Sequence, residues 1–208
     1  MMTNETTRYK EILLKGIWHE NPVAYQVLGI CSALAVTVKM STAIVMSLAL
    51  TLVTAFSSMI ISSMRNKIPS NIRIIAELAV IASMVIVTDE ILKAFFYDIS
   101  KQLSIFVGLI ITNCIVLGRA EAFALANKPL DAFVDGIANG LGYSLILIAV
   151  AFIRELLGAG ECLGYPVIPS VIYDAGYQNM GLMLLAPGAF FIIGLLVWLK
   201  NSISESKK

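Results

Sequence analysis

Residues 40–64 read MSTAIVMSLALTLVTAFSSMIISSM and contain no Asp, Glu, Lys or Arg. A helix needs about 20 apolar residues to cross the hydrocarbon core of a bilayer, and this stretch is long enough. Its many Ser, Thr and Ala residues would also let neighbouring helices approach closely, because close packing drives helix association in lipid. The stretch therefore predicts a transmembrane helix with a tightly packed face.

Other stretches of the chain share this lack of charge. They cover residues 21–38, 78–88, 102–118, 136–153 and 175–199. The short stretch 78–88 becomes long enough only if the helix extends to about 74–96 and takes in several charged residues. We therefore expect an all-α membrane protein of six transmembrane helices, with residues 1–208 forming a single integral membrane domain and no separate soluble domain.

Prolines mark two of the expected helices. The first begins at Asn21-Pro22, since Asn is a good N-cap and Pro suits the first helical position. The sixth contains Pro187-Gly188 near its middle. A kink or break is expected there, because proline removes one backbone hydrogen bond.

The composition agrees with a membrane protein and excludes several functions. Hydrophobic residues make up 58% of the chain and charged residues only 14%, whereas soluble domains carry roughly 25% charged residues. A net charge of +1 offers no basic surface for nucleic acid. His19 is the only histidine, which excludes a bis-histidine haem within this chain. Neither a P-loop nor a GxGxxG motif is present.

The distribution of positive charge predicts the orientation in the membrane. In the six-helix arrangement, eleven of the 15 Lys and Arg residues fall on the side that holds the amino terminus. Cytoplasmic loops carry an excess of Lys and Arg. Both termini are therefore expected in the cytoplasm.

The two halves of the chain share a pattern around two cysteines. Cys31 lies near the middle of the first predicted helix and Cys114 near the middle of the fourth, and two further helices follow each. Three helices are an odd number, so the second half would enter the membrane in the opposite orientation. This pattern predicts two inverted three-helix repeats, at about 21–96 and 102–200. In such proteins the functional site tends to lie at the midplane, where interrupted helices meet.

The two cysteines have three possible interpretations. A single free Cys is most often a small buried side chain. As a matched pair, Cys31 and Cys114 could ligate an iron–sulfur cluster, but a [2Fe–2S] cluster takes four ligands and another chain would have to supply two. A disulfide between them is the third possibility. Cys162, in the loop after the fifth helix, is expected to be an incidental thiol.

Asp89 and Asp135 are acidic residues with two interpretations each. Asp89 and Glu90 lie within or at the end of the third predicted helix, where ionisable residues are costly and usually mark ion pathways or pairs. The alternative is an interfacial pair between Asp89 and Lys93, four residues on. Asp135 directly precedes the fifth predicted helix, which indicates an N-cap, with attraction of a cation as the alternative.

Other charged residues are expected near the membrane surface. Glu77 follows Arg73 by four positions and should form a surface ion pair. Arg154 and Glu155 end the fifth predicted helix and are expected at the interface with water.

Four stretches resemble one known family of membrane subunits. They are NPVAYQVLGICSALAVT (21–37), YDISKQLSIFVGLIITNCIVLGRAEAFA (97–124), DGIANGLGY (135–143) and GLMLLAPGAFF (181–191). They look like the NqrD family, the D-type subunits of sodium-pumping NADH:quinone oxidoreductases. The resemblance covers nearly the whole chain except its tails and the loop at 160–179. The block TNCIVLGRAEAFA is shared with NqrE and with Rnf subunits, whereas the YDISKQLS lead-in and the short C-terminal tail favour NqrD.

The resemblance implies a function for the cysteines. Such subunits have six helices in two inverted repeats and sit in the bacterial inner membrane. Each pairs with an NqrE-like paralogue, within a six-subunit complex that also contains subunits A, B, C and F. Each of the two contributes two cysteines to a shared [2Fe–2S] cluster that relays electrons across the membrane. Here the metal and cofactor ligands would be Cys31 and Cys114.

The resemblance also implies an activity for the whole complex. The complex is a translocase, an NADH:ubiquinone reductase that transports Na+, and its D-type subunit has no activity alone. Acidic residues at the positions of Asp89 and Asp135 would handle sodium. Three alternatives remain: an Rnf-type subunit that uses ferredoxin, a stand-alone secondary transporter with an inverted repeat, and a subunit that only scaffolds a larger complex.

Overall fold

The structure is a computed structural model, and its description covers most of the chain. The described residues are 9–14, 16, 21–23, 25–95, 107–162, 165–166 and 180–205. Within them the chain is helical apart from turns and one antiparallel pair of two-residue strands, β1 (Glu161–Cys162) and β2 (Tyr165–Pro166). The helices are α2 (Ile30–Val36), α3 (Met40–Met64), η2 (Ser70–Ile72), α4 (Arg73–Phe95), α6 (Val107–Ile111), α7 (Cys114–Arg119), η3 (Ala120–Ala124), α8 (Pro129–Gly158), α10 (Gly181–Leu184) and α11 (Ala186–Glu205).

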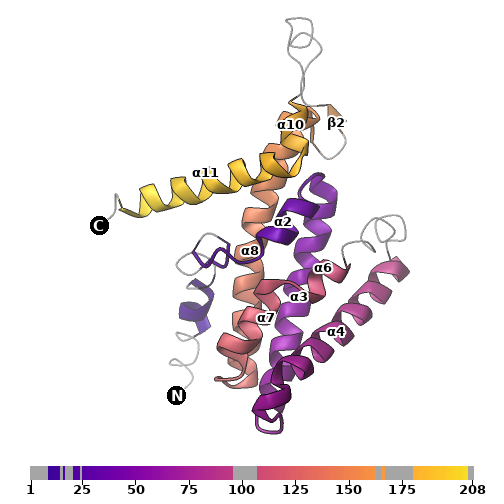
Figure 1. Cartoon of the computed structure of the whole chain (residues 1–208), viewed down its shortest axis with the longest axis vertical. Coiled ribbons are helices and arrows are strands. Elements are labelled where there is room, and N and C mark those ends of the chain that lie inside the picture. Colours follow the sequence, from indigo (N-terminus) through magenta and orange to yellow (C-terminus); the bar gives the residue numbers. More distant parts are fainter. Residues whose placement is uncertain are drawn as a thin grey trace, which may run out of the picture.

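The long helices α3 and α8 run antiparallel through the middle of the molecule. Figure 1 shows α4 on the α3 side of this pair and α11 crossing near one end of α8. Two glycines of α8 allow the pair to approach closely. A Cβ atom at Gly136 would lie 2.7 Å from the Cα of Ala55, and one at Gly140 would lie 2.8 Å from Thr51. The prediction of a tightly packed helix over 40–64 is therefore confirmed.

Three helices in the described residues are long and apolar enough to cross a membrane. They are α3, α8 and the part of α11 from Ala186 to Ile203. The third predicted helix is also present as one continuous helix, α4. It carries more charged residues than the three helices named above and is not among them. An all-helical membrane protein is thus confirmed, apart from the short strand pair, whereas six spanning helices are not.

The first predicted helix is replaced by a short helix and an irregular segment. Among its described residues only Ile30–Val36 is helical, and Gly29 before it adopts a left-handed conformation with a φ of 77°. Asn21 does not cap a helix. Its side chain accepts a hydrogen bond from the amide of Val23 at 3.1 Å and donates one to the carbonyl of Gly142 at 2.9 Å. Asn21 thus ties the irregular segment to α8.

The fourth predicted helix is also interrupted. It divides into α6 and α7, with Asn113 extended between them at a φ of −70° and a ψ of 123°. The Asn113 side chain accepts a hydrogen bond from the amide of Ile115 at 3.0 Å and so caps α7. Cys31 and Cys114 therefore lie at the starts of short helices, and their predicted position in the middle of long helices is wrong.

The break in the sixth predicted helix is confirmed, slightly earlier than expected. It falls at Leu185, between α10 and α11, so that Pro187 occupies the first turn of α11. Proline is tolerated in that turn because its missing amide would have no helical partner there. The fifth helix begins earlier than expected, because Lys128 is its N-cap and Pro129 its first residue.

The glycine contact between α3 and α8 can be tested by one added methyl group. In Gly136→Ala the two backbones must separate, so we expect a loss of about 1–3 kcal/mol of stability. Thermal denaturation of the purified protein measures this loss. Gly194→Ala is the matched control, because nothing lies within 4 Å of a Cβ atom at that position of α11. Equal stability of the two variants would contradict the close approach.

Candidate functional site

Cys31 and Cys114 are the reactive groups of the candidate site. Both are free thiols and both are exposed in this chain. The two thiols are thus not joined in a disulfide, and neither is buried by the described residues of this chain. Cys162 lies in β1, and its side chain falls outside the described residues.

The breaks in the two helices bring the neighbours of the cysteines together. Ser32 follows Cys31 and Asn113 precedes Cys114, and the Asn113 amide nitrogen donates a hydrogen bond to the Ser32 hydroxyl at 2.9 Å. Gly29 lies so near Ile115 that a Cβ atom there would be 2.5 Å from the Ile115 Cδ1 atom. Polar and apolar contacts thus join the starts of α2 and α7.

The two thiols are ligands of the kind that iron–sulfur clusters use. Among the residues that the structure describes, no group of three or more His, Cys, Asp and Glu side chains could hold a metal ion. Two exposed thiols, on helices joined directly beside them, could supply two of the four ligands that a [2Fe–2S] cluster requires. Their exposure leaves them accessible to a second chain.

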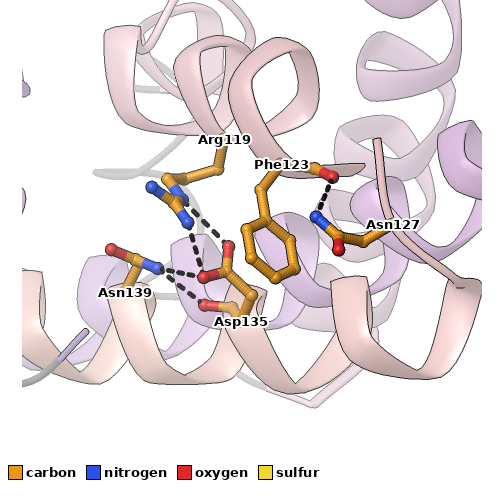
Figure 2. Close-up of polar contacts among 5 residues, drawn as sticks. All are labelled: Arg119, Phe123, Asn127, Asp135 and Asn139. Carbon is orange, nitrogen blue, oxygen red and sulfur yellow. Dashed lines mark hydrogen bonds and ion pairs between the residues drawn. The ribbon is translucent and has the colours of Figure 1, made fainter. Parts of the chain in front are cut away.

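Asp135 lies inside α8 and forms a buried ion pair with Arg119. Its two carboxylate oxygens accept hydrogen bonds from Arg119 Nε at 2.9 Å and Nη2 at 2.5 Å, as Figure 2 shows. Asn139 donates a further bond to this carboxylate at 3.0 Å, and the guanidinium lies 5.3 Å from the centre of the Phe123 ring. Because α8 begins at Pro129, the N-cap interpretation of Asp135 is wrong. The pair ties the last residue of α7, the helix that begins at Cys114, to α8.

Asp89 forms the ion pair that its spacing indicates. Its carboxylate lies 2.6 Å from Nζ of Lys93, which also contacts Glu90 at 2.9 Å. The interpretation as an i,i+4 pair is therefore confirmed. Asp89 lies in α4 and Asp135 in α8, so both acidic residues are on helices other than the two that carry Cys31 and Cys114.

Glu77 and Arg154 are buried, contrary to expectation. Glu77 does pair with Arg73, at 3.5 Å, but its side chain has no exposed surface. Arg154, only 1% exposed, donates hydrogen bonds to backbone carbonyls that include Leu34 of α2 and Leu184 of α10. The interfacial interpretation of Arg154 is therefore wrong, because the buried guanidinium donates hydrogen bonds to carbonyls at the C-terminal ends of two short helices.

Glu155 is buried with Arg154 and caps a different helix. Its carboxylate accepts a hydrogen bond from the amide of Met40, the first residue of α3, at 2.7 Å. A carboxylate is favourable at the amino end of a helix, where amides lack helical partners and the dipole is positive. An Arg-Glu sequence at a helix end is equally compatible with buried contacts to other helix ends and with a position at the membrane surface. The sequence alone therefore does not distinguish the two.

Ser32, Asn113 and Tyr143 are site residues that sequence reasoning missed. The Tyr143 hydroxyl lies 2.8 Å from Ser32 Oγ, so α8 also contacts the cysteine-bearing helices. Each of these residues falls within a stretch that carries the family resemblance. A polar residue directly beside each cysteine was the available signal.

Comparison with known proteins places this site in a family. The model of the Rnf-Nqr subunit family, described as membrane protein, matches residues 9–197. The chain belongs to the Rnf-Nqr family. This confirms the resemblance inferred from the sequence.

Individual relatives cover almost the full length of the chain. The D subunit of the Na(+)-translocating NADH-quinone reductase from Photobacterium profundum is 59% identical over 194 residues, 93% of this chain and 92% of the relative. A protein of the same name from Serratia proteamaculans is 56% identical over 203 residues, 98% of this chain and 97% of the relative. Another from Haemophilus ducreyi is 60% identical over 189 residues, 91% of each chain.

The buried pair of Arg119 and Asp135 makes a testable contribution to stability. Removing one partner of a buried ion pair typically costs about 3–5 kcal/mol, because the other charge stays buried and uncompensated. We therefore expect Arg119→Gln and Asp135→Asn each to lower the denaturation temperature of the complex in potassium buffer. The double variant should lose less than the sum of the two. Additive losses would contradict a direct pair.

Proposed function

We propose that this chain is the D-type component of a bacterial Na+-translocating NADH–quinone oxidoreductase, a redox-driven sodium pump. Relatives that carry this name match it at 56–60% identity and over more than nine-tenths of both lengths. The chain is then one part of an enzyme and has no complete activity alone. Its own contribution is to carry electrons within the membrane.

We propose that Cys31 and Cys114 hold half of a [2Fe–2S] cluster. The observation that carries this proposal is that both thiols are free and exposed, at the starts of two helices that are hydrogen-bonded beside them. Thiolates are the ligands that such clusters use. When bound there, the cluster would supply one-electron transfer inside the membrane.

The residues around the cysteines suit this role. The two breaks place the thiols at helix starts, and these short helices contact α3, one of the long apolar helices. Irregular backbone at membrane depth is tolerated only where protein buries it or a cavity hydrates it. Here the side chains of Asn21 and Asn113 satisfy backbone groups in the two irregular segments.

The two cluster ligands that this chain does not supply indicate what kind of partner it needs. Two further thiols must come from another chain, and the proposed source is an NqrE-like paralogous subunit that presents a similar pair. Subunits A, B, C and F would complete the complex. An Rnf-type complex, which uses ferredoxin, is the alternative within the family, and the names of the relatives favour the quinone reductase.

We also propose that the fold is an inverted repeat with both termini in the cytoplasm of an inner-membrane protein. In each half a short helix with a cysteine in its first two positions leads into a long helix, α2 into α3 and α7 through η3 into α8. The two long helices are antiparallel, as an inverted repeat requires, and they approach each other closely at Gly136 and Gly140.

The cluster proposal is tested on the complete purified complex. We expect Cys31→Ala and Cys114→Ala each to remove one [2Fe–2S] signal from the low-temperature EPR spectrum, to lower the iron content, and to abolish quinone reduction. Cys162→Ala is the matched control and should keep all three. Unchanged iron and turnover in the first two variants would contradict the proposal and favour a scaffold or transporter function.

Asp89 and Asp135 are proposed to handle sodium. Both carboxylates already bind a tethered cation, Lys93 and Arg119 respectively. At Asp135 both carboxylate oxygens accept hydrogen bonds from Arg119, so a sodium ion that bound this carboxylate directly would compete with the guanidinium. Asp135 gives the sharper case, because it is only 4% exposed and an uncompensated charge there would be costly.

Exchange of Arg119 for sodium has a direct readout. In Arg119→Gln the buried Asp135 carboxylate lacks its guanidinium. We therefore expect the complex to denature at a higher temperature in NaCl than in KCl of equal ionic strength. Wild type and Arg119→Gln/Asp135→Asn should show a smaller difference between the salts. Equal denaturation temperatures of Arg119→Gln in the two salts would contradict a role of Asp135 in sodium binding.

A further inference from the structure

Ser32 Oγ is the meeting point of three hydrogen bonds. It lies 2.9 Å from the carbonyl oxygen of Gly29, 2.8 Å from the hydroxyl of Tyr143 and 2.9 Å from Nδ2 of Asn113. A hydroxyl has one proton and two acceptor lone pairs. These three contacts therefore saturate Ser32.

Chemistry determines the direction of each bond. The Asn113 Oδ1 atom accepts from the Ile115 amide, so the NH2 group of this side chain faces Ser32 and must donate. The Gly29 carbonyl can only accept, so it takes the Ser32 proton. The remaining lone pair of Ser32 accepts the proton of Tyr143. Each bond thus has one permitted donor.

Burial makes this arrangement costly to change. Ser32, Asn113 and Tyr143 are 3%, 4% and 0% exposed. A buried donor or acceptor that loses its partner destabilises the fold, because it cannot regain a hydrogen bond from solvent. With little water to substitute, any movement of one cysteine-bearing helix away from the other leaves polar groups unpaired.

The location of the three residues connects them to the cysteines. Ser32 follows Cys31 directly, Asn113 precedes Cys114 directly, and Tyr143 comes from α8, which packs along α3. The Gly29 carbonyl belongs to the break itself, where Gly29 also contacts Ile115. The network thus ties both helix starts to each other and to a long membrane helix.

We propose that Ser32, Asn113 and Tyr143 are positioning residues that set the separation of the Cys31 and Cys114 thiols. This inference rests on the proposed function, in which those thiols hold a [2Fe–2S] cluster. None of the three residues would be a ligand. They set the geometry at iron, and hence the midpoint potential and the EPR spectrum, through the backbone that carries the two sulfurs.

Two variants of the complete complex test the network in graded steps. Tyr143→Phe removes one hydrogen bond and keeps the ring, whereas Ser32→Ala removes all three. We expect both to keep iron but to shift the EPR g values and the midpoint potential, with the larger shift in Ser32→Ala. Ser62→Ala is the matched control, because its hydroxyl also bonds across elements, to the carbonyl of Asn127 at 2.6 Å, and Ser62 lies outside the network around the cysteines.

The outcomes separate this inference from the proposed function. If Cys31→Ala abolishes the cluster signal while Ser32→Ala and Tyr143→Phe leave the g values and the potential at their wild-type values, the positioning role is overturned and the proposed function stands. If Cys31→Ala leaves the signal intact, the proposed function is overturned and the inference falls with it. Should Ser32→Ala fail to assemble, Tyr143→Phe alone decides.

Discussion

The close approach of α3 and α8 is the constraint on which the other elements depend. Gly136 and Gly140 let the two backbones meet, and small residues of α3 face them. Polar contacts close the pair at both ends. Glu155 of α8 binds the first amide of α3, and Ser62 near the other end of α3 binds the loop that leads into α8. The short helices that carry the cysteines are attached to this pair.

The breaks in the membrane helices follow from the need to satisfy buried backbone groups. An unpaired amide or carbonyl costs several kcal/mol in hydrocarbon, so an irregular segment survives there only with side-chain or protein partners. Asn21, Ser32 and Asn113 supply those partners, and Arg154 supplies them at the carbonyl ends of α2 and α10. These side chains replace some of the backbone hydrogen bonds that a continuous helix would have made at each break.

Sequence patterns predicted the continuous helices and the break beside Pro187, but they missed the breaks at Gly29 and Asn113. The stretch 40–64 is one helix because nothing in it interrupts the hydrogen-bond ladder. Residues 21–38 are equally free of charge, yet Gly29 turns left-handed there, and absence of charge carries no information about continuity. Asn113 caps α7, but the apolar character of the residues around it does not reveal a helix start inside that run. Arg154 was misplaced because a charge at a helix end has the same pattern whether lipid headgroups or carbonyls receive it.

Several charged side chains of the described helices are paired within the chain, whereas both thiols are exposed. Arg119 pairs with Asp135, Lys93 with Asp89, and Glu155 with the amino end of α3. Such internal compensation suits residues inside a membrane, where an unpaired charge is expensive. Cys31 and Cys114 differ, because they are exposed on a framework that holds their neighbours in place. Two exposed potential ligands on such a framework support the proposal that another chain completes the site.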